Sequence, residues 1–325
     1  MKKVSIIVPC YNEENNVEPM AEKLTEIMEK KRKYDYEIVF RNNASTDKTM
    51  EKLRLMAEKN KKIKVISNTR NYGVSPIKDT FIGRVTGDVI ICIACDFQEP
   101  PELIPEFLYW WERGYEVVAG QKTASKEGKI KYGLRQIFYK LIGAFSENPQ
   151  VKNMSGITLM SRRIAELWWG NNRDEYFRYF VTDLGVDIKL IPYVQEKRRS
   201  GKSSYNIWKS LSFALDSMIM TSVAPLRIAT VLGVICSVMS FLIGLIYLIL
   251  KLIWWYDFAA GTAPILIGLF FIGSIQLLFI GIVGEYVGVI LRKTTVQNPP
   301  IVNELINIDE NDPYYFKRVN DDCNI

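Results

Sequence analysis

The chain contains no histidine among its 325 residues, so it has neither an imidazole base nor a histidine metal ligand. Cysteine is scarce, at five residues, and only Cys92 and Cys95 have the C-x-x-C spacing. A zinc site would need a second such pair, which the sequence lacks. Because these two cysteines fall inside an apolar run, we interpret them as small core residues of a protein from a reducing compartment.

Several sequence patterns are also missing. The chain has no internal repeat and no helix-turn-helix, zinc-finger or RNA-binding motif. Its first residues contain only a short apolar run, which Pro9 interrupts, and this is typical of a β-strand and not of a secretory signal. We therefore interpret the net charge of +6 as attraction to phosphate-bearing substrates or anionic lipid, with no nucleic acid as partner.

Apolar residues are concentrated toward the end of the chain. Residues 228–250 carry no charge, and residues 263–291 form a second apolar stretch that only Gln276 and Glu285 interrupt. About 20 apolar residues suffice for a membrane-spanning helix. The sequence therefore predicts two transmembrane helices within residues 226–291.

The flanking segments indicate an orientation for this hairpin. Arg227 precedes the first span, and Arg292 and Lys293 follow the second. By the positive-inside rule both ends face the cytoplasm, which predicts an integral protein of the cytoplasmic membrane in contact with membrane lipid. We expect an amphipathic interfacial segment at 207–225 and a cytoplasmic tail at 292–325.

The first 206 residues alternate between two periodicities. Apolar, β-branched runs predict strands at 4–10, 36–40, 63–67, 89–94, 115–121 and 186–193. Helical spacing predicts helices at 14–31, 49–59 and 136–145. This alternation predicts an α/β domain over residues 1–206 with a mostly parallel sheet, whose ligands lie at the carboxyl ends of the strands.

The most specific motif is CDFQEPPELIP at 95–105, which follows a predicted buried strand. Asp96 and Gln98 are two residues apart and point the same way from an extended chain. Their oxygen atoms suit a hard cation such as Mg²⁺ or Mn²⁺ that bridges phosphates. The alternative is a surface turn that ends at Pro100 and Pro101.

Two further loops follow predicted strands. In PCYNEE, we expect Pro9 to fix a turn, Tyr11 to face a base or ribose and Glu13 to bond ribose hydroxyls. In NNASTD, the amide of Asn42 can pair with a base edge. The alternative is that these polar residues cap the helices that follow.

Basic residues mark two more candidate contacts. Arg70 follows the third predicted strand, where a guanidinium can neutralise a diphosphate, unless it is a solvated surface residue. The stretch EKRRSGKSSYN at 196–206 places Arg198 and Ser203 just before the membrane segment. It can hold a phosphate group or simply attract anionic lipid.

These motifs together resemble the polyprenyl-phosphate glycosyltransferases of glycosyltransferase family 2. The segments that carry the resemblance, in order, are VPCYNEEN, STDKT, RNYG, GDVI, DFQEPPELIP, FYKL, LMSRR, RRSGKSSY, APLRIAT and GIVGEYVG. The resemblance implies a GT-A fold with inverting transfer from a nucleotide-sugar donor to undecaprenyl phosphate. It also implies a divalent cation, Mg²⁺ or Mn²⁺, and a homo-oligomer packed through the hairpins.

The resemblance also implies roles for residues. The nucleotide is expected at Pro9, Tyr11, Glu13 and Asn42, and the metal at Asp96 and Gln98. The lipid phosphate is expected at Arg135, Arg198 and Ser203. Asp96 is therefore our candidate for catalysis and donor binding as well as for the metal, with Arg70 added on the donor side.

The chain departs from the family pattern at three places. Paired acids after the second strand are Asn42 and Asn43 here, the first acid of a D-x-D motif is Ala94, and an acid expected before LMSR is Gly156. Asp183 is our guess for a replacement acid. Two alternatives therefore stay open: the same fold acting on another lipid acceptor, or a catalytically impaired homologue that serves as a membrane-bound partner.

Overall fold

A computed structural model of the chain describes residues 1–73, 82–125, 154–170, 177–196, 224–253, 262–294 and 300–308. Three sites predicted for the lipid phosphate, at Arg135, Arg198 and Ser203, lie outside these residues. So do the predicted helix 136–145 and nearly all of segment 207–225.

The chain divides into two compact units, each of which is described by itself. Unit 1 comprises Met1–Leu134, Gln150–Ser204 and Gln297–Ile325, and unit 2 comprises Arg135–Pro149 and Tyr205–Val296.

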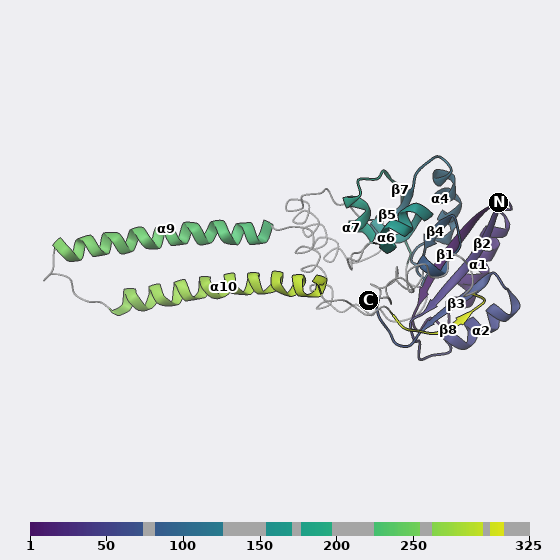
Figure 1. Cartoon of the computed structure of the whole chain (residues 1–325), viewed down its shortest axis with the longest axis horizontal. Helices are drawn as coiled ribbons and strands as arrows, with labels where there is room; N and C mark the ends of the chain where they lie inside the picture. The colour runs from purple at the N-terminus through teal and green to yellow at the C-terminus, as the bar shows by residue number, and fades with distance from the viewer. Residues whose placement is uncertain are drawn as a thin grey trace, which may run out of the picture. The chain divides into compact units, whose positions relative to one another are not determined.

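Unit 1 is built on one eight-stranded sheet with the order β7-β5-β6-β4-β1-β2-β3-β8 (Figure 1). The strands are β1 Lys2–Cys10, β2 Tyr34–Asn42, β3 Ile63–Asn68, β4 Val89–Cys92, β5 Val117–Ser125, β6 Met154–Ser161, β7 Ile188–Gln195 and β8 Val302–Ile306. Neighbours pair in parallel for β1–β2, β1–β4, β2–β3 and β5–β7, and antiparallel for β4–β6, β5–β6 and β3–β8. The mostly parallel α/β sheet that the sequence predicts is confirmed.

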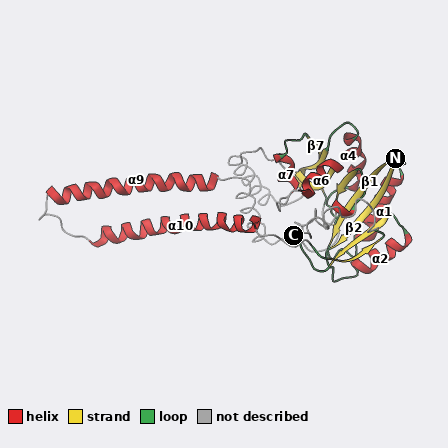
Figure 2. Ribbon diagram, viewed as in Figure 1, coloured by secondary structure: helices red, strands yellow, loops and turns green. Residues whose placement is uncertain are grey.

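Helices cover both faces of this sheet (Figure 2). They are α1 Val17–Glu29, α2 Thr49–Lys59, α4 Ile104–Trp111, α6 Arg162–Gly170 and α7 Phe177–Asp183, with short 3₁₀ turns at Ile82–Arg84 and Pro101–Leu103. In β1, Ile6 and Val8 point into the core that contains α1, α2 and α4, whereas Ile7 points into the core that contains α6 and α7. Burial on both faces explains why the central strands read as continuous apolar runs.

The six predicted strands and two of the predicted helices are present, with shifted ends. α2 begins and ends at the predicted residues, whereas β4 ends at Cys92 and not at residue 94. The sequence reasoning missed β6, β8, α4, α6 and α7. β6, MSGITLMS, contains a glycine and three hydroxyl residues, which weaken a strand pattern.

The strand β8 brings the end of the chain into the sheet of unit 1. It pairs antiparallel with β3, with Val65 opposite Ile306. Glu304 accepts two hydrogen bonds from the Arg54 guanidinium on α2, at 2.6 and 3.1 Å. Asn307 donates to the carbonyls of Ala57 and Ile63 at 2.7 and 2.9 Å. Part of the segment expected as a cytoplasmic tail, residues 302–306, therefore covers the outer edge of the sheet.

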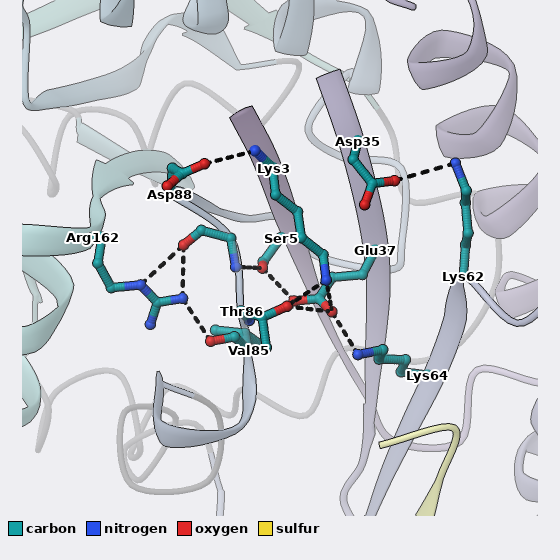
Figure 3. A network of polar contacts seen from close by, with 11 residues as sticks. Lys3, Ser5, Asp35, Glu37, Lys62, Lys64, Val85, Thr86, Asp88 and Arg162 are labelled. Atoms are coloured by element: carbon teal, nitrogen blue, oxygen red, sulfur yellow. Dashed lines mark hydrogen bonds and ion pairs between the residues drawn. The ribbon is translucent and has the colours of Figure 1, made fainter. Parts of the chain in front are cut away.

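The amino-terminal half of the sheet holds a buried charge network, the Glu37 network, made of Lys3, Ser5, Glu37, Lys64 and Thr86 (Figure 3). Glu37 on β2 is 1% exposed. Its carboxylate accepts from the Ser5 hydroxyl at 2.5 Å and the Thr86 N–H at 2.7 Å, and pairs with Lys64 at 2.7 Å and Lys3 at 3.4 Å.

The lysines and hydrogen-bond donors of this network stabilise the charged form of Glu37. Burial alone would raise the pKa of Glu37, but the Lys64 ammonium and the hydrogen bonds from Ser5 and Thr86 outweigh it and hold the pKa below its usual range. The carboxylate therefore remains charged inside the sheet.

Arg162 fastens the neighbouring loop to this half of the sheet. At the start of α6, its guanidinium donates to the carbonyls of Val85 at 2.6 Å, Gly87 at 2.7 Å and Ile82 at 3.3 Å (Figure 3). Gly87 has no room for a side chain, since a Cβ there would stand 2.6 Å from the Ser5 backbone nitrogen. The motifs GDVI and LMSRR thus meet in one structural contact.

Unit 2 contains two long helices, α9 Ala224–Ile253 and α10 Thr262–Thr294. They cover the two predicted spans. They contact each other, since a Cβ at Gly233 would stand 3.1 Å from the Phe279 ring. Within the described residues, one stretch, Phe271–Gly288 of α10, has the length and composition to cross a membrane, with a mean hydropathy of 1.6. The crossing itself stays a prediction.

Candidate active site

Three loops meet at the carboxyl edge of the sheet. They follow β1, β2 and β4, and the strand register sets Cys10 opposite Asn42 on β2 and Ile7 opposite Cys92 on β4. Each loop contains a non-glycine residue with positive φ: Asn12 at 55°, Ala44 at 58° and Phe97 at 58°. Such conformations cost roughly 1–3 kcal/mol each and are concentrated at functional sites.

The first two loops are hydrogen-bonded to each other. The Asn12 N–H donates to the Ser45 hydroxyl at 3.0 Å, and the Asn12 side-chain oxygen accepts from the Thr46 N–H at 2.8 Å. The Glu13 N–H donates to the Thr49 hydroxyl at 2.9 Å. The loops therefore form one rigid wall of the edge, and Ser45 and Thr46 serve as turn residues.

The residues predicted to hold the nucleotide differ in exposure and in their hydrogen bonds within the fold. Tyr11 is 39% exposed and is open to a ligand. Glu13 is buried and accepts a hydrogen bond from the Asn16 side-chain amide at 2.5 Å, so it is engaged locally, although α1 has no side-chain cap in the described structure. Pro9 lies inside β1, opposite Arg41, and does not form the turn that we expected. The β1–β4 ladder ends at Ile7, so Pro9 is tolerated there without a backbone N–H.

The side chains after β2 and β3 are mostly engaged within the fold. The Asn42 amide donates to the Ser67 hydroxyl and accepts from the Ser45 N–H, both at 3.1 Å. Asn43 donates to Asn71 and to the Gly73 carbonyl. Arg70 is exposed, and its guanidinium lies 4.5 Å from the centre of the Tyr72 ring. Arg70 thus remains accessible to an anion, whereas a base contact by Asn42 would require its present bonds to change.

The predicted metal residues lie in the loop after β4. Asp96 and Gln98 are half-buried, and an Asp96 carboxylate oxygen accepts from the Gln98 N–H at 3.1 Å. Within the described part of the chain, no three histidine, cysteine, aspartate or glutamate side chains are grouped to hold a metal. The oxygen donors of Asp96 and Gln98 fit a hard cation in kind, and such a cation would take further ligands from phosphate.

Asp183, the guessed replacement acid, is the last residue of α7 and is exposed. The helix is held to the start of β6, because the Arg178 guanidinium donates to the Met154 carbonyl at 2.7 Å. Its catalytic assignment stays a prediction.

The sequence reasoning missed Glu99, the residue after Gln98. Glu99 is 5% exposed, and its atom Oε2 has no hydrogen-bond partner among the described residues. Burial raises the pKa of Glu99, although backbone N–H groups of Ile157, Gly156 and Ala94 and the charge of Lys122 oppose the rise. The two prolines that follow Glu99 were the available signal, since they fix the loop that carries it.

The cysteines near this edge are buried or half-buried. Cys10, Cys92 and Cys95 are free thiols, and burial raises the pKa of Cys92 to about 12. They therefore serve as small packing residues, as the sequence indicates.

Comparison with known proteins identifies the family. Residues 5–168 match the model described as glycosyl transferase family 2. The chain belongs to this family. Its sheet has the GT-A fold, and the edge of loops after β1, β2 and β4 is our candidate for the active site.

Three relatives extend the similarity over almost the whole chain. An uncharacterized glycosyltransferase of Synechocystis is 31% identical over 309 residues, which are 94% of this chain and 96% of that protein. A prophage bactoprenol glucosyl transferase homolog of Escherichia coli is 32% identical over 88% of this chain and 94% of that protein. A bactoprenol glucosyl transferase of Shigella phage SfX is 31% identical over 90% and 96%.

Proposed function

We propose that this glycosyltransferase moves a single sugar from a nucleotide-sugar to a polyprenyl phosphate, such as undecaprenyl phosphate, at the cytoplasmic face of a membrane. The observation that carries this proposal is the combination, in one chain, of a family 2 sheet with two long apolar helices. The names of the bactoprenol glucosyl transferases, similar along nearly their full length, support the lipid acceptor.

The helices α9 and α10 supply the membrane anchor in this proposal. Side chains such as Leu232, Met239, Leu269 and Phe271 are at least half exposed in unit 2, which is unfavourable in water and favourable in lipid. We propose that the two helices span the membrane as a hairpin, with the sheet and β8 on the cytoplasmic side. Packing of hairpins from several copies would give the homo-oligomer.

The donor site is proposed at the carboxyl edge. Tyr11 would contact the base or ribose, and Arg70 would lie near the diphosphate. Asp96 and Gln98 would hold Mg²⁺ or Mn²⁺, which supplies positive charge to the departing diphosphate. Asp96 and Gln98 are half-buried, which limits their contact with water and strengthens their interaction with a cation.

The acceptor explains how the reaction proceeds with few acids. A polyprenyl phosphate is already an anion, so its oxygen can attack the anomeric carbon without a general base, with inversion at that carbon. Arg135, Arg198 and Ser203 are proposed to bind this phosphate, which would bring it close to the donor.

The test is transfer from a panel of radiolabelled nucleotide-sugars to undecaprenyl phosphate in detergent with Mg²⁺ or Mn²⁺. The wild type is compared with Asp96→Ala and with Glu106→Gln, an exposed residue of α4, as the matched control. We expect turnover with one donor, its loss in Asp96→Ala and its retention in the control. Nucleotide binding without transfer from any donor would instead support the impaired-homologue alternative.

A second arm tests the acceptor. The same donor is offered to diacylglycerol and to polyprenyl phosphate in parallel. Faster transfer to diacylglycerol would reject the polyprenyl acceptor while leaving the glycosyltransferase assignment intact.

A further inference from the structure

A group of buried polar side chains lies where β6 begins. It consists of Glu99, Ser155 and Tyr193, which are 5%, 8% and 6% exposed, and we name it the Glu99 cluster. Within the described part of the chain, Glu99 Oε2, Ser155 Oγ and Tyr193 Oη have no hydrogen-bond partner of good geometry, although Tyr193 is close enough to Ser155 and Glu99 to interact weakly with both. Buried polar atoms are nearly always paired, so three such atoms together indicate a place for the polar groups of a ligand.

The fold holds the Glu99 carboxylate where β4 and β6 separate. The ladder between these strands ends at the pair Cys92–Thr158. Two residues beyond it, the backbone N–H groups of Ala94 and Gly156 face the carboxylate. Glu99 thus places one carboxyl group between the two positions at which the family pattern led us to expect acids.

Glycine at position 156 places no side chain against this carboxylate. Gly156 is exposed although its neighbours Ser155 and Ile157 are buried. A Cβ at position 156 would stand 3.1 Å from Glu99 Oε1 and 3.4 Å from Oε2. A side chain there would therefore lie against the carboxylate, and its absence leaves room for a ligand group.

A second glycine makes room for the two hydroxyls. A Cβ at Gly120 on β5 would stand 2.6 Å from Ser155 Oγ and 2.9 Å from the Tyr193 ring. The two polar side chains occupy the space that a larger residue would fill. The Glu99 cluster is therefore built from two strands, β6 and β7, and one loop of unit 1, beside Gly120 on β5.

We infer that the Glu99 cluster binds hydroxyl groups of the transferred sugar, and that Glu99 is a specificity-determining residue; this inference rests on the proposed function. A carboxylate only accepts hydrogen bonds, whereas serine and tyrosine hydroxyls both donate and accept. The hydroxyls of a sugar satisfy all three. Asp96 and Gln98 in the same loop would place the diphosphate of the donor next to it.

The surroundings of the cluster favour a sugar over a second metal ion. Lys122 on β5 lies in register with Tyr193 and is close enough to interact electrostatically with Glu99. A neighbouring cation disfavours another cation at the same carboxylate. A neutral hydroxyl is compatible with both charges.

The experiment uses the full-length protein in detergent and the donor found with the transfer panel. Wild type, Glu99→Gln and the matched control Glu102→Gln, whose side chain is 60% exposed, are assayed with that donor and with its monodeoxy analogues. In the wild type, removal of the hydroxyl that Glu99 binds should lower kcat/KM at least about 100-fold. In Glu99→Gln, kcat/KM for the full donor should fall by a similar factor. Removal of the same hydroxyl from the donor should then lower kcat/KM of this variant by less than about 5-fold.

Binding of the nucleoside diphosphate is measured by calorimetry as a second readout. It should be unchanged in Glu99→Gln, because the cluster contacts only the sugar. An identical ranking of the deoxy analogues by wild type and Glu99→Gln would overturn the inference, as would an equal loss of nucleoside diphosphate affinity.

The inference and the proposed function fail in different ways. If the wild type transfers no sugar, the proposed function fails, and calorimetry with nucleotide-sugars still tests the cluster. In that case, preference for the full donor over one deoxy analogue should be present in the wild type and absent in Glu99→Gln. Its equal presence in both proteins would reject the cluster as a sugar site.

Discussion

The buried carboxyl groups at the two ends of the sheet in unit 1 differ in their hydrogen-bond and ion-pair partners. At the amino-terminal half, Glu37 has two lysines and two hydrogen-bond donors around it. At the carboxyl edge, Glu99 is nearly as buried but keeps one oxygen without a partner in the described structure. The first carboxylate is satisfied by the fold alone, whereas the second is left for a ligand.

Backbone conformation follows the same division. Of the four non-glycine residues with positive φ in the described structure, Asn12, Ala44 and Phe97 follow β1, β2 and β4 at the carboxyl edge. The fourth, Asn307, lies beside Ile63 at the amino end of β3. Strain and unpaired polar atoms thus coincide at the end where parallel sheets bind ligands, which separates residues for function from residues for stability.

The largest expected effect comes from Asp96 at the carboxyl edge. Asp96→Asn should reduce kcat for sugar transfer roughly 1,000-fold, about 4 kcal/mol in the barrier, because the site loses the charge that would hold the cation. Tm, measured by differential scanning fluorimetry, should stay unchanged. A fall in Tm with full activity would place Asp96 with the stabilising residues and break the comparison.

Substitution of Lys64, in the Glu37 network, should lower stability and leave activity unchanged. Lys64→Met should lower the free energy of unfolding by about 3 kcal/mol at pH 7, since it leaves Glu37 buried with less compensation. Transfer activity below the melting temperature should persist. The matched control is Lys62→Met, because Lys62 forms a 3.5 Å ion pair with Asp35 in which both side chains are about half exposed (Figure 3).

The loss of stability in Lys64→Met should depend on pH. The folded pKa of Glu37 is below its unfolded value of about 4.3, so its stabilisation is present above that pH and is lost as pH falls through the folded pKa. Urea unfolding at pH 7 and at pH 3 should therefore show a smaller difference between wild type and Lys64→Met at pH 3. An equal difference at both values would mean that the charge pair is not the cause.

Substitution of Glu99, at the carboxyl edge, should raise stability and lower activity. Glu99→Gln is expected to raise the free energy of unfolding at pH 7 by about 1 kcal/mol, because a neutral amide is less costly to bury than a carboxylate. The activity should fall, as argued above. Urea unfolding of Glu99→Gln beside Glu102→Gln measures the change, and a marked destabilisation would assign Glu99 to the structural side.

The smallest effect is expected at the outer edge of the sheet. Glu304→Gln removes the ion pair to Arg54, in which the two side chains are 32% and 52% exposed, so the global loss should be about 0.5 kcal/mol. Hydrogen exchange should quicken in β8 and leave β1 unchanged. The exposed Glu58→Gln on α2 is the control, and faster exchange throughout the sheet would contradict a purely local role.

Local patterns were sufficient for the elements with strong periodicity. The apolar runs of β1 and β2 and the amphipathic spacing of α1 and α2 identify these elements because burial imposes the pattern. β8 escaped notice because VNELI alternates weakly and forms only through pairing with β3. Of the candidate site, the three loops were predictable from the strands that they follow, but the use of each side chain was not.

By itself, the sequence determined the family, the α/β class and the loops at which a ligand binds, since motif order and periodicity are properties of the chain. Tertiary structure decided which polar residues are already engaged and which are not. Asn42 and Glu13 are engaged within the fold, and Glu99 lies between Ala94 and Gly156 with an unpaired oxygen. The physical reason is that hydrogen-bond satisfaction and burial depend on neighbours from distant strands, which no local pattern records.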